Sequence, residues 1–343
     1  MKKKKTTIKD IANVLNISAA AVSKALHNDS RISEKTKENV RQVAKKLQYQ
    51  PNHLASALRS GKSNLVGVIV PRTNSNFFSS VIQNIEEVLN KKGYSIIITQ
   101  SNESYDKECK SIDTLLYTQV DGIIASMANE TIDLSSYEKI KSKGIPLILF
   151  DRGENDLNVD YIGIDDYNSS HVIVEHLVKN GCQRIAHIGG YKRTRIYNNR
   201  IRGYVDALKK HKLPLDAELL TEGDLTIEDG RIKMRQLLSL KTRPDAVYVA
   251  GDYAALGALQ VLKEHKILVP EEISLVGFGN EPFTDMVTPK ITSVNQHSAE
   301  IGKQAANTFL KYIENDTIEQ SLNKIILTAK LIVRDSSNKK TPL

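Results

Sequence analysis

The 343-residue sequence contains no tryptophan, only two cysteines, and no run of 18 or more apolar residues. Without such a run we expect no transmembrane helix and no membrane partner. No apolar segment follows the basic start MKKKKTTIKD, so we expect no secretory signal. Cys109 and Cys182 lie far apart and lack metal-ligand spacing. They are expected to be reduced, buried thiols of a cytoplasmic protein, with no metal site.

Catalytic motifs are missing as well. No G-x-G-x-x-G follows an expected strand, no H-E-x-x-H occurs, and no Ser/His/Asp arrangement is evident. The stretch SGKS at residues 60–63 has Ser56 where a phosphate-binding loop requires glycine. We therefore expect no catalytic residue and no cofactor. A sugar-active enzyme stays an alternative, although no catalytic pair stands out.

Positive charge is concentrated at the start of the chain. Residues 1–63 hold 11 Lys and 3 Arg against 2 Asp and 2 Glu, a net charge of +10. Residues 64–343 hold 34 basic and 36 acidic side chains, a net charge of −2. This asymmetry indicates a nucleic-acid-binding head on a near-neutral body.

The head shows helical periodicity in three segments. A first helix is expected within TIKDIANVLN, where Thr7 and Asp10 resemble a capping box. The stretch NIS ends the pattern, and Ser18 is a good N-cap for a second helix. A third helix is expected from about Ser33 to Leu47. Two helices joined by a short turn, with a third to close the core, predict a helix-turn-helix domain.

A short hinge helix is expected next. Pro51 stops the third helix, Asn52 can cap a helix over residues 53–59, and Gly61 ends it. A helix of about two turns is not stable alone in water, so it needs a partner to become ordered.

The body alternates apolar strands with amphipathic helices in two successive series, with a boundary near Gly163. The first series begins at NLVGVIVP and the second at RIAHIGG. Alternation of this kind predicts two doubly wound parallel sheets. Such sheets bind ligands at the carboxyl ends of their strands, so a cleft between the two subdomains is a natural small-molecule site.

These features together resemble one family. The segment TIKDIANVLNISAAAVSKALHN is similar to the DNA-binding head of the LacI/GalR family of bacterial transcription regulators, and GVIVP, VDGIIAS, IPLILFDR, RIRGYVDAL, GDYAALGAL and ISLVGFGNEPF resemble landmarks of its ligand-binding core. The resemblance implies an all-α helix-turn-helix head plus an α/β periplasmic-binding-protein-like core. It implies a helix-turn-helix domain over residues 1–50, followed by a hinge helix and linker over 51–63. The N-subdomain of the core would comprise residues 64–163 and 294–323. The C-subdomain would comprise 164–293 and 324–336, and residues 337–343 would form a tail.

By this resemblance the second helix reads bases in the major groove. Ala19 and Ala20 would contact thymine methyl groups or allow close approach, and Lys24 would reach guanine or phosphate. Further DNA contacts are expected from Thr7, Ser18, Ser23, Asn28, Asn52, His53, Ala55 and Leu58. Leu58 occupies the position from which family members insert a leucine into the minor groove.

The resemblance also implies effector contacts at Asp151, Arg152, Arg200, Asp252 and Gln296. Phe77 and Phe78 are expected to give a sugar ring an apolar face, and Phe283 is expected to close the other side. Aspartate and arginine suit a polyhydroxylated ligand because each can hold two hydroxyl groups. A sugar or sugar derivative is therefore expected. The basic loop around Lys192, Arg193 and Arg195 either selects an acidic or phosphorylated sugar or is simply solvated.

The expected function is a ligand-responsive regulator, a repressor that binds a palindromic operator on double-stranded DNA as a homodimer. No apolar heptad follows the last strand, so no tetramer is expected. Two alternatives stay open: a solute-binding protein for a sugar, and a regulator that responds to a non-sugar effector such as a nucleobase.

Overall fold

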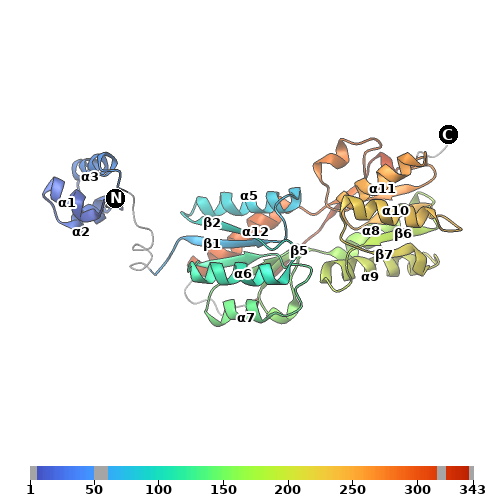
Figure 1. Ribbon diagram of the computed structural model, residues 1–343, viewed down its shortest axis with the longest axis horizontal. Helices are drawn as coiled ribbons and strands as arrows, with labels where there is room; N and C mark the ends of the chain where they lie inside the picture. The colour runs from blue at the N-terminus through green and yellow to red at the C-terminus, as the bar shows by residue number, and fades with distance from the viewer. Residues whose placement is uncertain (1–5, 50–60, 315–321, 340–343) are drawn as a thin grey trace. The chain divides into compact units, whose positions relative to one another are not determined.

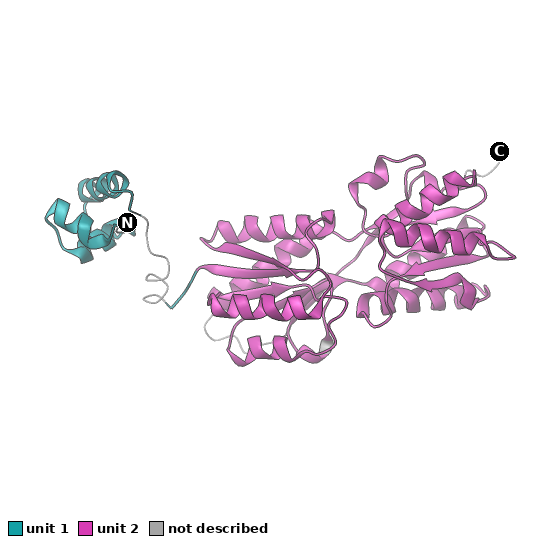
Figure 2. Cartoon of the chain, viewed as in Figure 1, with its two compact units in different colours: residues 1–63 teal, residues 64–343 magenta. Residues whose placement is uncertain are grey.

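The computed structural model describes residues 6–49, 61–314 and 322–339. The chain forms two compact units, Met1–Ser63 and Asn64–Leu343 (Figure 2). The expected hinge helix, with Asn52, His53, Ala55 and Leu58, lies outside the described residues.

The first unit contains the three expected helices, labelled in Figure 1: α1 (Ile8–Leu15), α2 (Ala19–Leu26) and α3 (Glu34–Lys46). Each helix contributes apolar side chains to one small core, centred on the fully buried Ile11, Val22, Ala25 and Val40. Only three residues separate α1 from α2, so the predicted helix-turn-helix geometry is confirmed.

Helix capping explains the ends of α1 and α2. The backbone N–H of Thr7 donates to the Asp10 carboxylate at 2.7 Å. Asn16 ends α1 in the left-handed conformation, with φ of 49°. The Ser18 hydroxyl then accepts a hydrogen bond from the backbone N–H of Ala21 at 3.1 Å. The chain therefore turns sharply and restarts as α2 with a satisfied N-terminus.

The second unit has two α/β lobes. The N-lobe contains a parallel six-stranded sheet in the order β11-β5-β4-β3-β1-β2. Its strands are β1 (Leu65–Val70), β2 (Ser95–Gln100), β3 (Gly122–Ala125), β4 (Leu147–Phe150), β5 (Asp160–Ile164) and β11 (Lys324–Leu327). Its helices are α5 (Asn76–Asn90), α6 (Tyr105–Tyr117), α7 (Ser135–Ser142) and α12 (Ser298–Glu314), and a short 3-10 helix η1 (Asn155–Leu157) precedes β5.

The C-lobe contains a parallel four-stranded sheet in the order β7-β6-β8-β9. Its strands are β6 (Ile185–Gly189), β7 (Leu220–Glu222), β8 (Ala246–Val249) and β9 (Ser274–Val276). Its helices are α8 (Asp166–Lys179), α9 (Arg195–Lys210), α10 (Ile227–Leu238) and α11 (Asp252–Glu264), with 3-10 turns η2 (Ala217–Leu219), η3 (Pro282–Asp285) and η4 (Asp335–Ser337).

Side-chain alternation along the strands explains the layers. In β1, Val66, Val68 and Val70 belong to the core shared with α5 and α12, whereas Ile69 belongs to the core shared with α6 and α7. Successive strand residues point to opposite faces, so a strand covered on both faces must be apolar throughout. The C-lobe repeats the pattern, with α8 and α9 on one face and α10 and α11 on the other.

The chain passes between the lobes three times. It leaves the N-lobe after β5, returns from β10 (Ser293–Asn295) to α12, and leaves again from β11 to β12 (Lys330–Ile332). Strands β10 and β12 pair antiparallel where two of these passages run together.

One predicted boundary is wrong. Residues 324–327 were assigned to the C-subdomain, but β11 pairs with β5 in the N-lobe sheet, with Lys324 opposite Tyr161 and Leu327 opposite Ile164. KIILTAKLIV is not one strand, because Thr328 and Ala329 interrupt it and separate β11 from β12. The chain does finish in the C-lobe, where the η4 serine Ser336 donates its hydroxyl proton to the carbonyl of Leu275.

Both cysteines are free thiols. Cys182 is buried, as predicted, and burial raises the pKa of its thiol. Cys109 is only half-buried on α6, where it accepts a hydrogen bond from the Ser136 hydroxyl. The expectation of two buried thiols is therefore wrong for Cys109.

Candidate DNA-contacting surface and ligand cleft

Helix α2 presents a small, nearly smooth outer surface. Ala20 and Lys24 are exposed, and Ala19 and Ser23 are half-buried beside them. Residues three and four apart lie next to each other on a helix, so these four side chains share one face. Val22 and Ala25 on the opposite face are buried in the core of the head, and this packing fixes the orientation of α2 within the head.

Three of the residues predicted to contact DNA, Thr7, Ser18 and Asn28, lie at the ends of α1 and α2. All three are exposed. The Thr7 hydroxyl donates to Asp10 at 2.7 Å, and the Asn28 side-chain carbonyl accepts from Arg41. Asn28 therefore keeps its amide N–H groups for an anion, with the basic Arg41 beside it.

In the second unit, a cavity of about 480 Å³ lies between the N-lobe and the C-lobe. Its charged lining residues follow the carboxyl ends of strands in both lobes, where doubly wound sheets bind ligands. Seven of the eight residues predicted to contact an effector line this cavity: Phe77, Phe78, Asp151, Arg152, Arg200, Asp252 and Gln296.

Asp252 opens helix α11 directly after β8 and is 2% exposed. Its carboxylate accepts hydrogen bonds from the backbone N–H of Glu281 at 2.8 Å and from the Ser293 hydroxyl at 2.7 Å. Burial raises the pKa of Asp252 to about 6, although these two hydrogen bonds favour the ionised form. Asp252 is thus a fixed hydrogen-bond acceptor facing the cavity.

Arg200 lies on α9 and is almost fully buried. Its Nε donates to Asp166 at 2.8 Å and its Nη1 donates to the carbonyl of Ala250 at 2.9 Å. The guanidinium carbon lies 3.6 Å from the centre of the Phe278 ring. These contacts hold the guanidinium group rigidly at the cavity wall.

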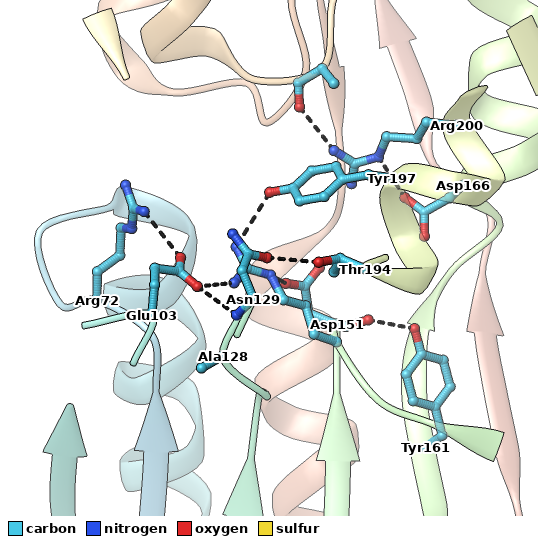
Figure 3. A network of polar contacts seen from close by, with 12 residues as sticks. Arg72, Glu103, Ala128, Asn129, Asp151, Tyr161, Asp166, Thr194, Tyr197 and Arg200 are labelled. Atoms are coloured by element: carbon cyan, nitrogen blue, oxygen red, sulfur yellow. Dashed lines mark hydrogen bonds and ion pairs between the residues drawn. The ribbon is translucent and has the colours of Figure 1, made fainter. Parts of the chain in front are cut away.

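Asp151 and Arg152 follow β4, and Asp151 lies in the polar network of Figure 3. Arg152 donates from Nη1 to Glu103 at 2.6 Å and from Nη2 to the Tyr197 hydroxyl at 3.3 Å. Asp151 adopts a left-handed backbone, with φ of 57°, and its carbonyl accepts from the Tyr161 hydroxyl. Burial raises the pKa of Asp151 to about 6.

Phe77, Phe78 and Gln296 complete the predicted lining. The two phenylalanine rings meet edge to face at 5.1 Å and give the cavity an apolar side. Gln296 is 8% exposed, and its buried side-chain carbonyl oxygen has no hydrogen-bond partner within the described chain. That oxygen is an available acceptor at the cavity wall.

Phe283 is the exception among the predicted effector contacts. It is half-buried in η3 and packs edge to face on Tyr253, with ring centres 5.1 Å apart. Tyr253, rather than Phe283, lines the cavity. The 3-10 turn places Phe283 behind Tyr253, so the predicted direct contact is corrected to an indirect one.

Two C-lobe residues hold the N-lobe loop that precedes α5. The Glu281 carboxylate accepts from the Ser75 hydroxyl at 3.1 Å and from the backbone N–H of Asn76 at 3.2 Å. The Tyr253 hydroxyl donates to the carbonyl of Asn74 at 3.2 Å. A carboxylate at the first turn of α5 also interacts favourably with the helix dipole. Glu281 therefore caps an N-lobe helix from the opposite lobe.

The basic loop does not contribute cations to the cavity lining. Lys192 pairs with Glu222 at 3.4 Å. Arg193 donates to the carbonyl of Asn129 and Arg195 donates to the carbonyl of Gly153, both in the N-lobe. The loop therefore forms hydrogen bonds from the C-lobe to the N-lobe. These contacts support neither of the two predicted roles, a solvated loop or a loop that selects an acidic ligand.

Several lining residues were not predicted from the sequence, among them Arg72, Tyr197, Tyr253, Phe278 and Glu281. They lie after β1, β8 and β9, or on α9. Because the carboxyl ends of the strands converge in this fold, these positions could have been used to predict that the residues line the cavity.

Among the described residues, no group of His, Cys, Asp and Glu side chains is placed to hold a metal ion. None of the described helices has both the length and the apolar character needed to cross a bilayer.

A helix-turn-helix head joined to a two-lobed body, with a cleft between the lobes that is lined by charged and aromatic side chains, defines the class of ligand-binding transcriptional regulators. Residues 7–52 match the family of bacterial regulatory proteins named lacI, and residues 174–337 match a periplasmic binding protein-like domain. The chain is 30% identical over 335 residues to the HTH-type transcriptional regulator DegA of Bacillus subtilis, covering 97% of this chain and 98% of DegA. It is also 30% identical to the HTH-type transcriptional repressor CytR of Escherichia coli, covering 96% of each chain.

Solved structures agree. The lac repressor dimer bound to operator and the anti-inducer ONPF shares the fold, with a TM-score of 0.86 at 23% identity over 97% of this chain and 99% of that one. The transcriptional regulator CelR in complex with cellobiose has a TM-score of 0.73 at 25% identity over 97% of this chain and all of that one. The chain belongs to the lacI family of bacterial regulatory proteins. It is a DNA-binding transcriptional regulator and not an enzyme.

Proposed function

We propose that this regulator binds a two-fold operator as a homodimer in the cytoplasm and responds to a small polyhydroxylated effector, a sugar or sugar derivative, held in the cleft. The observation that carries the effector class is the lining of the 480 Å³ cavity. It combines fixed carboxylate and guanidinium groups with two phenylalanine rings.

Sugars need this combination. Vicinal hydroxyl groups are held by groups that form two hydrogen bonds at once, and the apolar face of a sugar ring packs against aromatic side chains. Asp252, Asp151 and Gln296 supply acceptors, whereas Phe77 and Phe78 supply the apolar surface. The complex of the similar regulator CelR with cellobiose supports the same ligand class.

A nucleobase is the second candidate. The aromatic side chains Tyr197, Tyr253 and Phe278 also line the cavity and can contact a planar ring. The Gln296 carbonyl oxygen and the Asp252 carboxylate can accept from the amino groups of a base.

The homodimer follows from how the head reads DNA. One copy of α2 reaches one half-site, so a palindromic operator requires two heads related by a two-fold axis. The lac repressor dimer on its operator, with the same fold, supports this arrangement. We expect sedimentation to give a dimer, and a stable tetramer would contradict the proposal.

The effector is tested by a thermal-shift screen of the full chain against uncharged sugars, sugar phosphates and nucleobases, followed by mobility shifts with genomic fragments. The expected result is an uncharged sugar that raises Tm and changes the affinity for one class of fragment. Binding of no specific fragment, with or without any of these ligands, would reject the homodimeric operator-binding function.

A further inference from the structure

The cavity lining carries more negative than positive charge. Three arginines line it, Arg72, Arg152 and Arg200, against five carboxylates. The carboxylates are Asp151, Asp224, Glu228, Asp252 and Glu281. An anionic ligand therefore needs at least one arginine whose charge is available to it.

Two of the three arginines share one carboxylate that stands behind the lining. Glu103 accepts from Arg72 at 3.0 Å through Oε1 (Figure 3) and from Arg152 at 2.6 Å through Oε2. Glu103 itself is not part of the lining. Both guanidinium groups are thus directed toward Glu103, which offsets their charge before any ligand enters.

The third arginine is paired in the same way. Arg200 is bound to Asp166, which is 4% exposed and also lies outside the lining. Every arginine of the lining therefore has a carboxylate partner behind the cavity wall.

Glu103 is held in place for this role. Both Asn102 and Glu103 have positive φ, 52° and 64°, in the loop after β2. The backbone N–H of Asn129 donates to Glu103 Oε2 at 2.9 Å. Burial raises the pKa of Glu103, but the charge of Arg152 and these hydrogen bonds outweigh it and lower the pKa below its ordinary value. Glu103 is therefore ionised at neutral pH.

We infer that Glu103 determines specificity by partly offsetting the positive charge of Arg72 and Arg152, so that the cleft takes an uncharged ligand and rejects phosphorylated or acidic ones. This inference rests on the proposed function, because it assumes that the effector occupies this cleft. A phosphate group would have to displace Glu103 from two arginines while facing the carboxylates of the lining, and the mutual repulsion of these charges opposes that exchange.

The test is a substitution that removes the charge and keeps the size. In Glu103→Gln, Arg72 and Arg152 lose their shared counterion and become available to an anion. Inorganic phosphate and glucose 6-phosphate are titrated into the full chain at constant ionic strength. We expect the Glu103→Gln variant to bind glucose 6-phosphate roughly tenfold more tightly than the wild type.

Two control variants separate charge from other effects. Glu87→Gln makes the same charge change on the exposed surface of α5, where Glu87 pairs with Lys91. Both variants keep the same basic head, so any binding of phosphate to the head is equal in the two. Glu103→Asp keeps the charge but shortens the side chain. Neither is expected to gain affinity for phosphate, and adding Arg72→Gln to Glu103→Gln is expected to reverse most of the gain.

The inference is overturned if Glu103→Gln binds glucose 6-phosphate no better than Glu87→Gln, or if wild-type protein binds glucose 6-phosphate more tightly than it binds any uncharged sugar. The wild-type comparison decides the matter even if Glu103→Gln does not fold. If no sugar, charged or uncharged, binds the wild type, the proposed function fails instead, and the two failures are therefore distinguishable.

Discussion

Single side chains on α2 suggest that this head reads its operator with few polar contacts. Ala19 and Ala20 cannot hydrogen-bond a base, and Lys24 is the long polar side chain on the face they share. More of the discrimination should then come from DNA shape and half-site spacing.

Replacing Ala20 with glutamine should change which operator the protein prefers. A glutamine amide can bind adenine with two hydrogen bonds, and its cost in helix propensity is small. Selection from an operator library randomised at each half-site position should show a new preference, favouring adenine at one position. Glu38→Gln, an exposed change on α3, serves as the control. A uniform change in affinity without a change in preference would assign α2 a scaffolding role.

The two buried aspartates, Asp151 and Asp252, should make effector binding dependent on pH. Burial raises the pKa of both Asp151 and Asp252 to about 6, whereas an unfolded aspartate titrates near 4. Between these values the folded protein holds more protons than the unfolded chain, so these groups make stability fall as pH rises from about 4 to 6.

Ligand hydroxyl groups that donate to these carboxylates require the ionised form. Affinity for the effector should therefore be highest above pH 6 and fall below it, by up to about tenfold per pH unit for each carboxylate that must ionise. Isothermal titration between pH 5 and 7.5 measures the slope, and Asp252→Asn should flatten it. A constant affinity across this range would show that neither carboxylate is an acceptor for the ligand.

At the level of elements, α5 depends on the opposite lobe. Its first turn is capped by Glu281 rather than by a side chain of its own cap residue, Ser75. The same residue donates its backbone N–H to Asp252. Glu281 therefore links Asp252 of the cavity lining to the first turn of α5 in the N-lobe.

Glu281→Ala should weaken effector binding roughly tenfold, because the hydrogen bonds lost are to a charged group. Binding to operator without effector should change little, since the head has its own core. Titration calorimetry measures the first effect and mobility shift the second. Glu264→Ala on α11, which removes an exposed ion pair with Arg235 of α10, should leave both unchanged. Full effector affinity in Glu281→Ala would assign the cross-lobe contact no role in binding.

The sequence predicted most elements and the central part of the cleft. Asp151 and Asp252 come directly after apolar strands, and parallel strands end at one edge of a sheet. The hydrogen-bond partners of Glu103 and Glu281 were not predictable, because they lie far along the chain. Glu281 is about 200 residues from Ser75, and no local period connects them. Strand β11 was misplaced because its apolar pattern continues into β12 and does not identify the neighbouring strand.

At the scale of the whole molecule, the chain passes between the lobes three times, and its last segments therefore form part of both lobes. Strand β11 is an edge of the N-lobe sheet, and η4 contacts β9 in the C-lobe. Deleting residues 324–343 should therefore destabilise both lobes together. Thermal unfolding followed by circular dichroism should show a large loss of Tm or no cooperative transition. A normal N-lobe after the longer deletion would contradict this interdependence.

The same connectivity has a consequence for synthesis. A ribosome adds roughly 5–20 residues per second from the N-terminus, and the head is complete by residue 63, with a core that needs no later segment. Neither lobe of the body is complete until its final segment, β11 or η4, has been made. The DNA-contacting unit should therefore fold tens of seconds before the ligand-binding body, and the two lobes should mature nearly at the same moment. Each newly made chain then has a formed head before it has a cleft that can respond to an effector.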